Sequence, residues 1–220
     1  LCMVPLHPMG AIEDFIYVAE MTGLDALIFD PAYFDEAAVE IGKRCPGIRL
    51  FAFGKSAIAP DFLELVRTVE PAPFEARPAD PEDISRMPTT GGTTGKPKAI
   101  MLSQRAMTAM LAIQMAEWDW PAEVRTLICA PLSHSGVAML VPTLLRGGTL
   151  VVADCFDAEK VLAAIEKHRI TCTLLVPTMI YALLDHPRLD AYDISSLESV
   201  YYGAASINPE RLAEAIRRFG

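Results

Sequence analysis

The residue types best suited to chemistry lie in one stretch, residues 89–98, which reads TTGGTTGKPK. This stretch holds four threonine hydroxyls, three glycines and two lysines. Glycine lets the backbone turn so that several N–H groups converge on one anion. The hydroxyls add donors and the lysines add positive charge. The stretch therefore predicts a loop that binds a polyphosphate, with ATP as the ligand.

The Walker-type phosphate loop, G-x-x-x-x-G-K-[ST], does not describe this stretch. Pro97 stands where that motif needs a hydroxyl for magnesium, and Thr90 stands where it needs its first glycine. A G-x-G-x-x-G dinucleotide fingerprint is absent as well. A solvated Gly/Thr turn between two strands is the simpler alternative, but the length and composition of the segment favour phosphate binding.

Residues 90–98 resemble the Thr/Ser-Gly-Thr-Thr-Gly-x-Pro-Lys-Gly signature of the adenylate-forming enzymes. This superfamily comprises acyl-CoA synthetases, aryl-CoA ligases, firefly-type luciferases and peptide-synthetase adenylation domains. Gly91 stands where serine is usual, and Ala99 where glycine is usual. The resemblance implies that Thr90 and Lys98 are catalytic. It also implies a set of ATP-binding residues in this loop: Thr90, Gly91, Gly92, Thr93, Thr94, Gly95 and Lys98.

Two later segments follow in the order that the family shows. Residues 131–134, Pro-Leu-Ser-His, are similar to a Pro-Leu-x-His segment of acyl-CoA synthetases. This similarity implies that His134 orients the substrate carboxylate, as a catalytic and substrate-binding residue. A helix-entry histidine bonded to backbone is the alternative.

Residues 201–207, YYGAASI, resemble a Gly-Ala-Ala/Pro segment in which small residues let backbone approach the adenine and the acyl chain. The resemblance places Gly203, Ala204 and Ala205 at the nucleotide, and Tyr202 and Gly203 at the acid. A tyrosine of the core is the alternative for Tyr202.

The resemblance implies an α/β fold of repeated β-α units, forming mainly parallel sheets flanked by helices, as part of the large N-terminal domain of such an enzyme. Relatives continue with a Tyr-Gly-x-Thr-Glu segment that helps hold Mg²⁺ and with a small C-terminal domain that carries a catalytic lysine. These features do not occur in the 220 residues. We therefore expect a fragment that is inactive alone, with the main Mg²⁺ ligand outside it and no metal site of its own.

The implied reaction is the ATP-dependent activation of a carboxylic acid through an acyl-adenylate, followed by thioester formation with coenzyme A. Two alternatives stay open: an adenylation domain that loads a carrier protein, and a non-catalytic nucleotide-binding module. A kinase or ATP hydrolase would need a Walker-type hydroxyl or a kinase-like Asp/Asn set, which we do not find in the sequence.

Composition sets further limits on function. With 52% hydrophobic and 21% charged residues, the sequence is that of a well-buried globular protein. A net charge of −9 argues against a nucleic-acid partner, which requires a basic face. No apolar run approaches the roughly 18 residues of a membrane span. Five widely spaced cysteines without a C-x-x-C pair indicate reduced thiols and a cytoplasmic location. A homodimer is compatible with these features.

Hydrophobic periodicity predicts alternating strands and helices. Strands are expected at residues 1–6, 26–29, 48–53, 125–130, 149–153, 172–176 and 199–202. Helices are expected at residues 11–22, 31–44, 60–69, 103–118, 135–146, 157–168, 177–185 and 209–219. The proline- and acid-rich residues 71–83 are expected to connect a first α/β part, 1–70, to a second, 84–220.

Finer expectations follow from the same pattern. The alternation implies parallel sheets, with the Gly/Thr loop beyond the carboxyl end of a strand. Strands in the first part are apolar enough to be buried on both faces. The helix caps are expected at Ser103, Asp157 and Asn208. The buried stripe of the last helix is expected at Leu212, Ile216 and Phe219.

Overall fold

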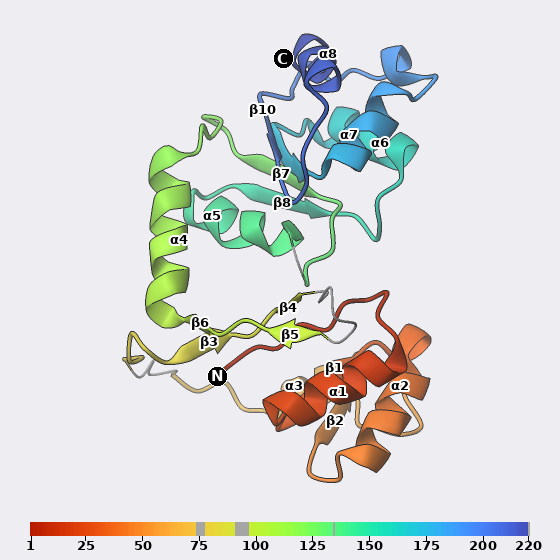
Figure 1. Cartoon of the computed structure of the whole chain (residues 1–220), viewed down its shortest axis with the longest axis vertical. Helices are drawn as coiled ribbons and strands as arrows, with labels where there is room; N and C mark the ends of the chain where they lie inside the picture. The colour runs from red at the N-terminus through yellow and green to blue at the C-terminus, as the bar shows by residue number, and fades with distance from the viewer. Residues whose placement is uncertain (74–77, 91–96, 134, 220) are drawn as a thin grey trace. The chain divides into compact units, whose positions relative to one another are not determined.

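A computed structural model describes residues 1–73, 78–90, 97–133 and 135–219 (Figure 1). The chain forms two compact units, Leu1–Met107 and Thr108–Gly220, and each is described by itself. The division at residues 71–83 that the sequence suggests stays a prediction. No helix in the described part of the chain has the length and apolarity needed to cross a bilayer.

Helices and strands alternate along most of the chain. The first unit contains α1 (Ile12–Thr22), β1 (Ala26–Phe29), α2 (Pro31–Arg44), β2 (Arg49–Ala52), α3 (Phe62–Thr68), β3 (Ile84–Arg86), β4 (Thr89–Thr90), β5 (Lys98–Ala99) and β6 (Leu102–Ser103). Helix α4 (Gln104–Glu117) begins in the first unit and ends in the second. The second unit continues with β7 (Arg125–Ile128), the 3-10 helix η1 (Ser135–Met139), α5 (Leu140–Leu145), β8 (Thr149–Val152), α6 (Ala158–His168), β9 (Cys172–Leu175), α7 (Pro177–Leu184), η2 (Leu189–Ala191), β10 (Ser199–Tyr202) and α8 (Pro209–Phe219).

In the first unit, β1 and β2 pair in parallel, and α1 and α2 cover one face of this pair. Leu27 and Phe29 of β1 point into that core. The opposite face is only partly covered, because Ile28 keeps 45% of its surface exposed and Phe53 keeps 49%. The expectation that these strands are buried on both faces is therefore wrong in this structure. On this face the ring of Phe62, at the start of α3, packs against Phe51 and Phe53, but Ile28 of β1 stays exposed.

The four short strands β3 to β6 of the first unit form two antiparallel pairs. Strand β3 pairs with β6, and β4 pairs with β5. The predicted strand at residues 1–6 is reduced to one parallel bridge, between Met3 and Arg86. The Met3 N–H donates to the Ser85 carbonyl at 3.0 Å, and the Met3 carbonyl accepts from the Met87 N–H at 2.9 Å. The start of the chain thus lies along β3 without forming a strand of its own.

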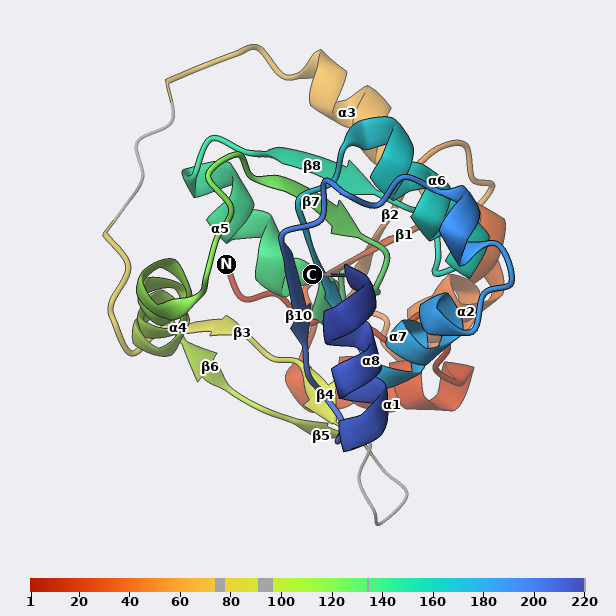
Figure 2. The ribbon, with the colours of Figure 1, turned by 90° about the horizontal axis from the view of Figure 1, so that it is seen from above.

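The second unit is built on a four-stranded parallel sheet in the order β10-β9-β7-β8. Helices α6, α7 and α8 cover one face, where Leu127 and Leu175 meet Leu162 and Ile180. Figure 2 shows these three helices together on one side of the strands and α5 on the other. On that second face Ile128 and Cys172 contact Met139 of η1. The predicted parallel α/β fold is confirmed, and the alternation of side chains along β7 gives the unit two cores.

Most predicted elements of this unit agree with the structure to within two residues, and so do its helix caps. Asp157 accepts from the Lys160 N–H at 2.9 Å. The Asn208 side chain accepts from the N–H groups of Glu210 at 2.8 Å and Arg211 at 3.2 Å. At the start of α4, in the first unit, Ser103 accepts from the Ala106 N–H at 3.2 Å.

The expected buried stripe of α8 needs one correction. Phe219 is buried, but Ile216 is 60% exposed, and Ala215 takes the buried position instead. A single helix covering the end of a sheet buries a narrow stripe, so adjacent positions such as 215 and 216 cannot both face the core.

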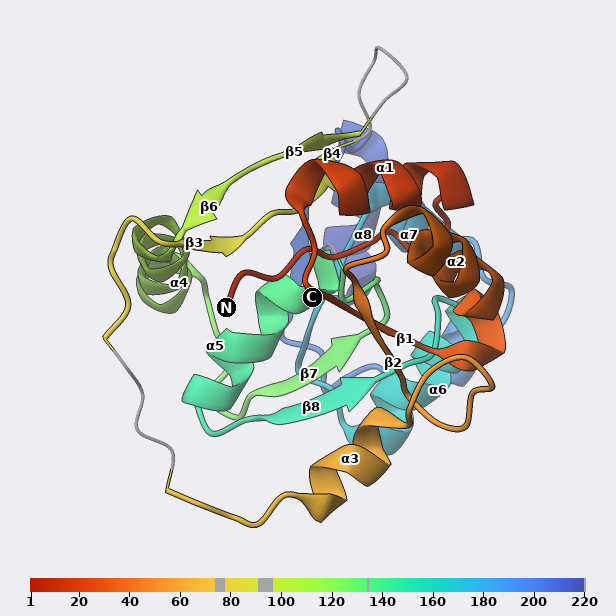
Figure 3. The same cartoon turned by 90° about the horizontal axis from the view of Figure 1, so that it is seen from below.

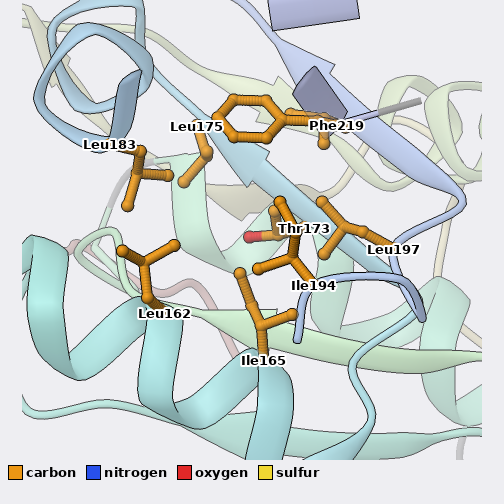
Figure 4. A pocket seen from close by; sticks show the side chains of 9 residues that line it. Leu162, Ile165, Thr173, Leu175, Leu183, Ile194, Leu197 and Phe219 are labelled. Carbon is orange, nitrogen blue, oxygen red and sulfur yellow. The ribbon is translucent and has the colours of Figure 1, made fainter. Parts of the chain in front are cut away.

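The core under α6 contains one small cavity of about 10 Å³. Figure 4 shows the side chains around it, with Leu162, Ile165 and Leu183 on one side and Leu197 and Phe219 on another. Its walls are apolar, and its volume is about that of one water molecule. It is a packing defect of the core and has no room for a ligand.

Ile165→Ala is expected to lower the free energy of unfolding of the second unit by about 2–5 kcal/mol, because it enlarges this cavity. Ile216→Ala, the matched control on an exposed position, is expected to change it by less than about 0.5 kcal/mol. Both tryptophans, Trp118 and Trp120, lie in the second unit, so tryptophan fluorescence during urea unfolding of the 220-residue chain reports on this unit. Equal losses for the two variants would contradict the assignment of α8's buried face.

Candidate functional site

The ends of the predicted phosphate loop are held together by β4 and β5. Thr90 lies directly opposite Lys98, and Thr89 opposite Ala99, in an antiparallel pair. The Ile100 N–H extends the pairing by donating to the Pro88 carbonyl at 2.9 Å. Opposite residues of such a pair point to the same face, with Cβ atoms about 4.5–5.5 Å apart. The exposed hydroxyl of Thr90 and the exposed ammonium of Lys98 therefore lie on one face of the hairpin.

The expectation that this loop follows a strand of a parallel sheet is wrong. Strand β5, which starts at Lys98, is the antiparallel partner of β4, which ends at Thr90, and this pair is separate from the parallel strands of the unit. A crossover between parallel strands needs about a dozen residues or more. Seven residues separate Thr90 from Lys98, which is enough for a hairpin loop only. The predicted ligands Gly91, Gly92, Thr93, Thr94 and Gly95 lie outside the described residues.

The other predicted site residues lie in the second unit, at the carboxyl edge of its sheet. Strands β7 and β10 are both parallel to β9, so the segments that follow them leave from the same edge. This edge is where ligands bind in parallel α/β sheets. Pro131 and Ser133 follow β7, and Gly203 follows β10. His134, which comes next after Ser133, lies outside the described residues.

The turn after β7 is closed by a very close backbone contact at Gly136. The Gly136 N–H donates to the Pro131 carbonyl at 3.1 Å. A Cβ atom on Gly136 would lie 2.3 Å from the Ala130 carbonyl oxygen and 3.0 Å from Ile128 Cγ2. Only glycine fits this position. Gly136 is not among the residues predicted from sequence, and the one signal for it is a glycine just inside the helix predicted at residues 135–146.

The segment that follows β10 is exposed and loosely packed. Tyr202, the last residue of β10, is 44% exposed. A Cβ on Gly203 would meet nothing within 4 Å. Ala204 has φ of 68°, in the left-handed region, which costs a non-glycine residue about 1–2 kcal/mol. Among the described residues, none lies close enough to Gly203 to require a small side chain there.

The buried cysteines are not suited to nucleophilic chemistry. Burial raises the pKa of the Cys129 thiol to about 11, and burial also raises the pKa of Cys172. All five cysteines are free thiols. Among the described residues, no group of three or more His, Cys, Asp or Glu side chains could hold a metal ion.

A parallel α/β unit with an open carboxyl edge, joined in sequence to a Gly/Thr hairpin with a lysine, is the arrangement of a nucleotide-binding enzyme domain. A sequence profile of the family described as AMP-binding enzyme matches residues 1–220, and the chain belongs to this family.

Relatives and solved structures agree with this assignment. The chain is 44% identical to the medium/long-chain fatty-acid–CoA ligase FadD8 of Mycobacterium tuberculosis, over 98% of this chain and 39% of that protein. It is 37% identical to a feruloyl-CoA synthase of an Amycolatopsis species, over 59% of this chain and 27% of that protein. The amide bond synthetase McbA from Marinactinospora thermotolerans superposes with a TM-score of 0.86 at 28% identity, over 100% of this chain and 48% of that one. The chain thus spans about two fifths of FadD8.

Two glycine variants separate folding from ligand binding at this edge. Gly136→Ala is expected to lower the free energy of unfolding of the second unit by about 1–3 kcal/mol, because its Cβ overlaps the Ala130 carbonyl. Gly203→Ala is expected to leave it within about 0.5 kcal/mol, since its Cβ meets nothing. In the full-length protein, however, Gly203→Ala is expected to weaken nucleotide binding about tenfold. Unchanged binding, measured by calorimetry, would remove Gly203 from the site.

Proposed function

We propose that the longer protein activates a carboxylic acid with ATP and transfers the acyl group to coenzyme A. A carboxylate oxygen attacks the α-phosphorus, the bond to the pyrophosphate oxygen breaks, and an acyl-adenylate forms. The coenzyme A thiol then attacks the acyl carbonyl, loses its proton, and displaces AMP. Membership of the AMP-binding family and the CoA-ligase names of its relatives support this reaction. The single structural observation behind it is the pairing of Thr90 with Lys98 across the Gly/Thr hairpin.

In this scheme the hairpin holds the β- and γ-phosphates. Thr90 and Lys98 approach them from one face, while the glycines and threonines of residues 91–95 supply further donors. A pair of unit charges 4 Å apart gains roughly 4 kcal/mol at an effective dielectric of 20, so Lys98 stabilises the charge on the phosphates. Phosphoryl-type transfer depends mainly on positioning and charge stabilisation, which is what such a hairpin offers. Mg²⁺ is proposed to accompany ATP.

The carboxyl edge of the second-unit sheet is proposed to hold the other substrate groups. His134 is assigned to the carboxylate, whose orientation decides whether in-line attack occurs. Gly203, Ala204 and Ala205 are assigned to the adenine and the acyl chain, with Tyr202 beside the acid. The exposure of Tyr202 and the open space at Gly203 support this assignment.

The substrate class follows the relatives. FadD8 is named for medium- and long-chain fatty acids, which makes these the first acids to test. Feruloyl-CoA synthase is named for an aromatic acid, which forms the second group. Loading of a carrier protein is the alternative for the acceptor, and non-catalytic nucleotide binding is the alternative for the whole protein. A cytoplasmic location and a homodimer stay predictions from the sequence.

The test of this function is ATP–pyrophosphate exchange by the full-length protein with a panel of carboxylic acids. We expect exchange that depends on the acid, together with AMP release when coenzyme A is added. Turnover of ATP to ADP without exchange would instead indicate kinase or hydrolase chemistry. Absence of both pyrophosphate exchange and ATP turnover would favour a non-catalytic nucleotide-binding module.

Lys98→Ala in the full-length protein is expected to lower the exchange rate at least about tenfold, because it removes the positive charge opposite Thr90. Lys96→Ala is the matched control: it removes the same charge two residues earlier and is expected to change the rate by less than about threefold. Equal effects of the two variants would mean that the net charge of the loop matters, and not the position of Lys98.

A further inference from the structure

A chain of buried hydroxyls joins the sheet of the second unit to the helix that follows β7. The Thr143 hydroxyl donates to the Met139 carbonyl at 2.6 Å, so its oxygen must accept from Thr126, which lies 2.7 Å away. A hydroxyl has one proton to donate. Thr126 has therefore used its own proton, and the Cys172 thiol, 3.2 Å away, donates to it. Thr126, Thr143 and Cys172 are fully buried, so the direction of every proton in this chain is fixed.

A second contact joins η1 to α4. The Nε2 of Gln114 on α4 donates to the Ala138 carbonyl of η1 at 3.4 Å. Gln114 is only 5% exposed although it is polar and lies on a helix. A buried side-chain amide needs a hydrogen-bond partner, and the Ala138 carbonyl is that partner.

These two contacts hold the last two carbonyls of η1. Thr143 and Thr126 connect its last carbonyl, that of Met139, to β7 and β9, and Gln114 connects the preceding carbonyl to α4. Met139 itself is 1% exposed and packs against Ile128. The η1 helix begins at Ser135, shortly after the Pro131–Ser133 segment at the carboxyl edge. Both contacts therefore lie at the end of this five-residue helix that is farther from that segment.

We propose that Thr143, Thr126 and Gln114 are positioning residues for acid activation: they fix η1, and with it the Pro131–Ser133 turn at the carboxyl edge of the sheet. This inference rests on the proposed function, because the turn precedes the residue assigned to the carboxylate. None of the three residues touches substrate in this assignment. Loss of their contacts acts on the acid and leaves ATP bound by the hairpin.

The test compares Thr143→Val with Thr173→Val in the full-length protein. Thr173 is the matched control, since it is equally buried and its hydroxyl donates to the Leu127 carbonyl at 2.9 Å on the opposite face of the sheet. Both variants lose one buried hydroxyl of the same size. Thr143→Val is expected to raise KM for the acid in pyrophosphate exchange about tenfold, with KM for ATP changed less than about twofold. Thr173→Val is expected to change neither, and Thr143→Ser is expected to restore the acid KM.

Hydrogen exchange gives a readout that does not depend on activity. Amides of residues 131–141 are expected to exchange at least about tenfold faster in Thr143→Val, and at the wild-type rate in Thr173→Val. Gln114→Met keeps the length of the side chain but loses the donor, and it is expected to show the same faster exchange. It replaces Thr143→Val in this test if Thr143→Val does not fold.

The outcomes separate the two proposals. An unchanged acid KM alongside equal losses of melting temperature in the two threonine variants would overturn the positioning role. Absence of acid-dependent exchange in the wild-type protein would overturn the proposed function instead. In that case faster hydrogen exchange in Thr143→Val alone would still establish that these residues fix the turn, and equal exchange in both variants would refute it.

Discussion

The parallel hydrogen bonding of β10, β9, β7 and β8 is the constraint on which the second unit depends. Because all four strands run the same way, the chain must leave every one of them at the same edge and return over a face of the sheet. Figure 3 shows the helices that make these returns. Both faces are thereby buried, and the carboxyl edge is left as the place where backbone and polar side chains meet solvent. The segments after β7 and β10 lie at this edge because both strands are parallel to β9, whatever chemistry they carry.

A sheet buried on both faces has to satisfy its polar side chains internally. Thr126 and Thr173 belong to adjacent strands, and each points into a different core. The Thr173 hydroxyl donates to the Leu127 carbonyl of the neighbouring strand. The Thr126 hydroxyl instead donates to Thr143, whose hydroxyl donates to the Met139 carbonyl of η1. The first bond joins two strands of the sheet, and the second pair of bonds joins the sheet to the helix beside the candidate site. Thr143 and Thr173 are equally buried but have these different partners, which is why they form a matched pair.

Much of this architecture follows from sequence because the signals are local. The strand at 199–202 and the helix at 209–219 were bounded correctly by apolar runs and by the cap at Asn208. Only part of the candidate site could be predicted from such local signals. Composition indicates a phosphate loop, but the antiparallel pairing of Thr90 with Lys98 depends on which strand the chain returns to. Gln114 and Ile216 were missed or misplaced because their surroundings depend on residues distant in sequence. Gly136 was missed because its close contact with the Ala130 carbonyl depends on the path of the turn after β7, which residue type alone does not reveal.

The position of Pro142 shows why a proline is tolerated here. It is the third residue of α5, so the N–H that it lacks has no carbonyl partner within that helix. The Thr143 hydroxyl, next along the chain, donates to the Met139 carbonyl at the end of η1. Gln114 of α4 donates to the neighbouring Ala138 carbonyl, with an amide that brings no charge into the core. A 3-10 helix has weak hydrogen-bond geometry of its own, so these side chains of α4 and α5 add to the bonds that hold η1 in place.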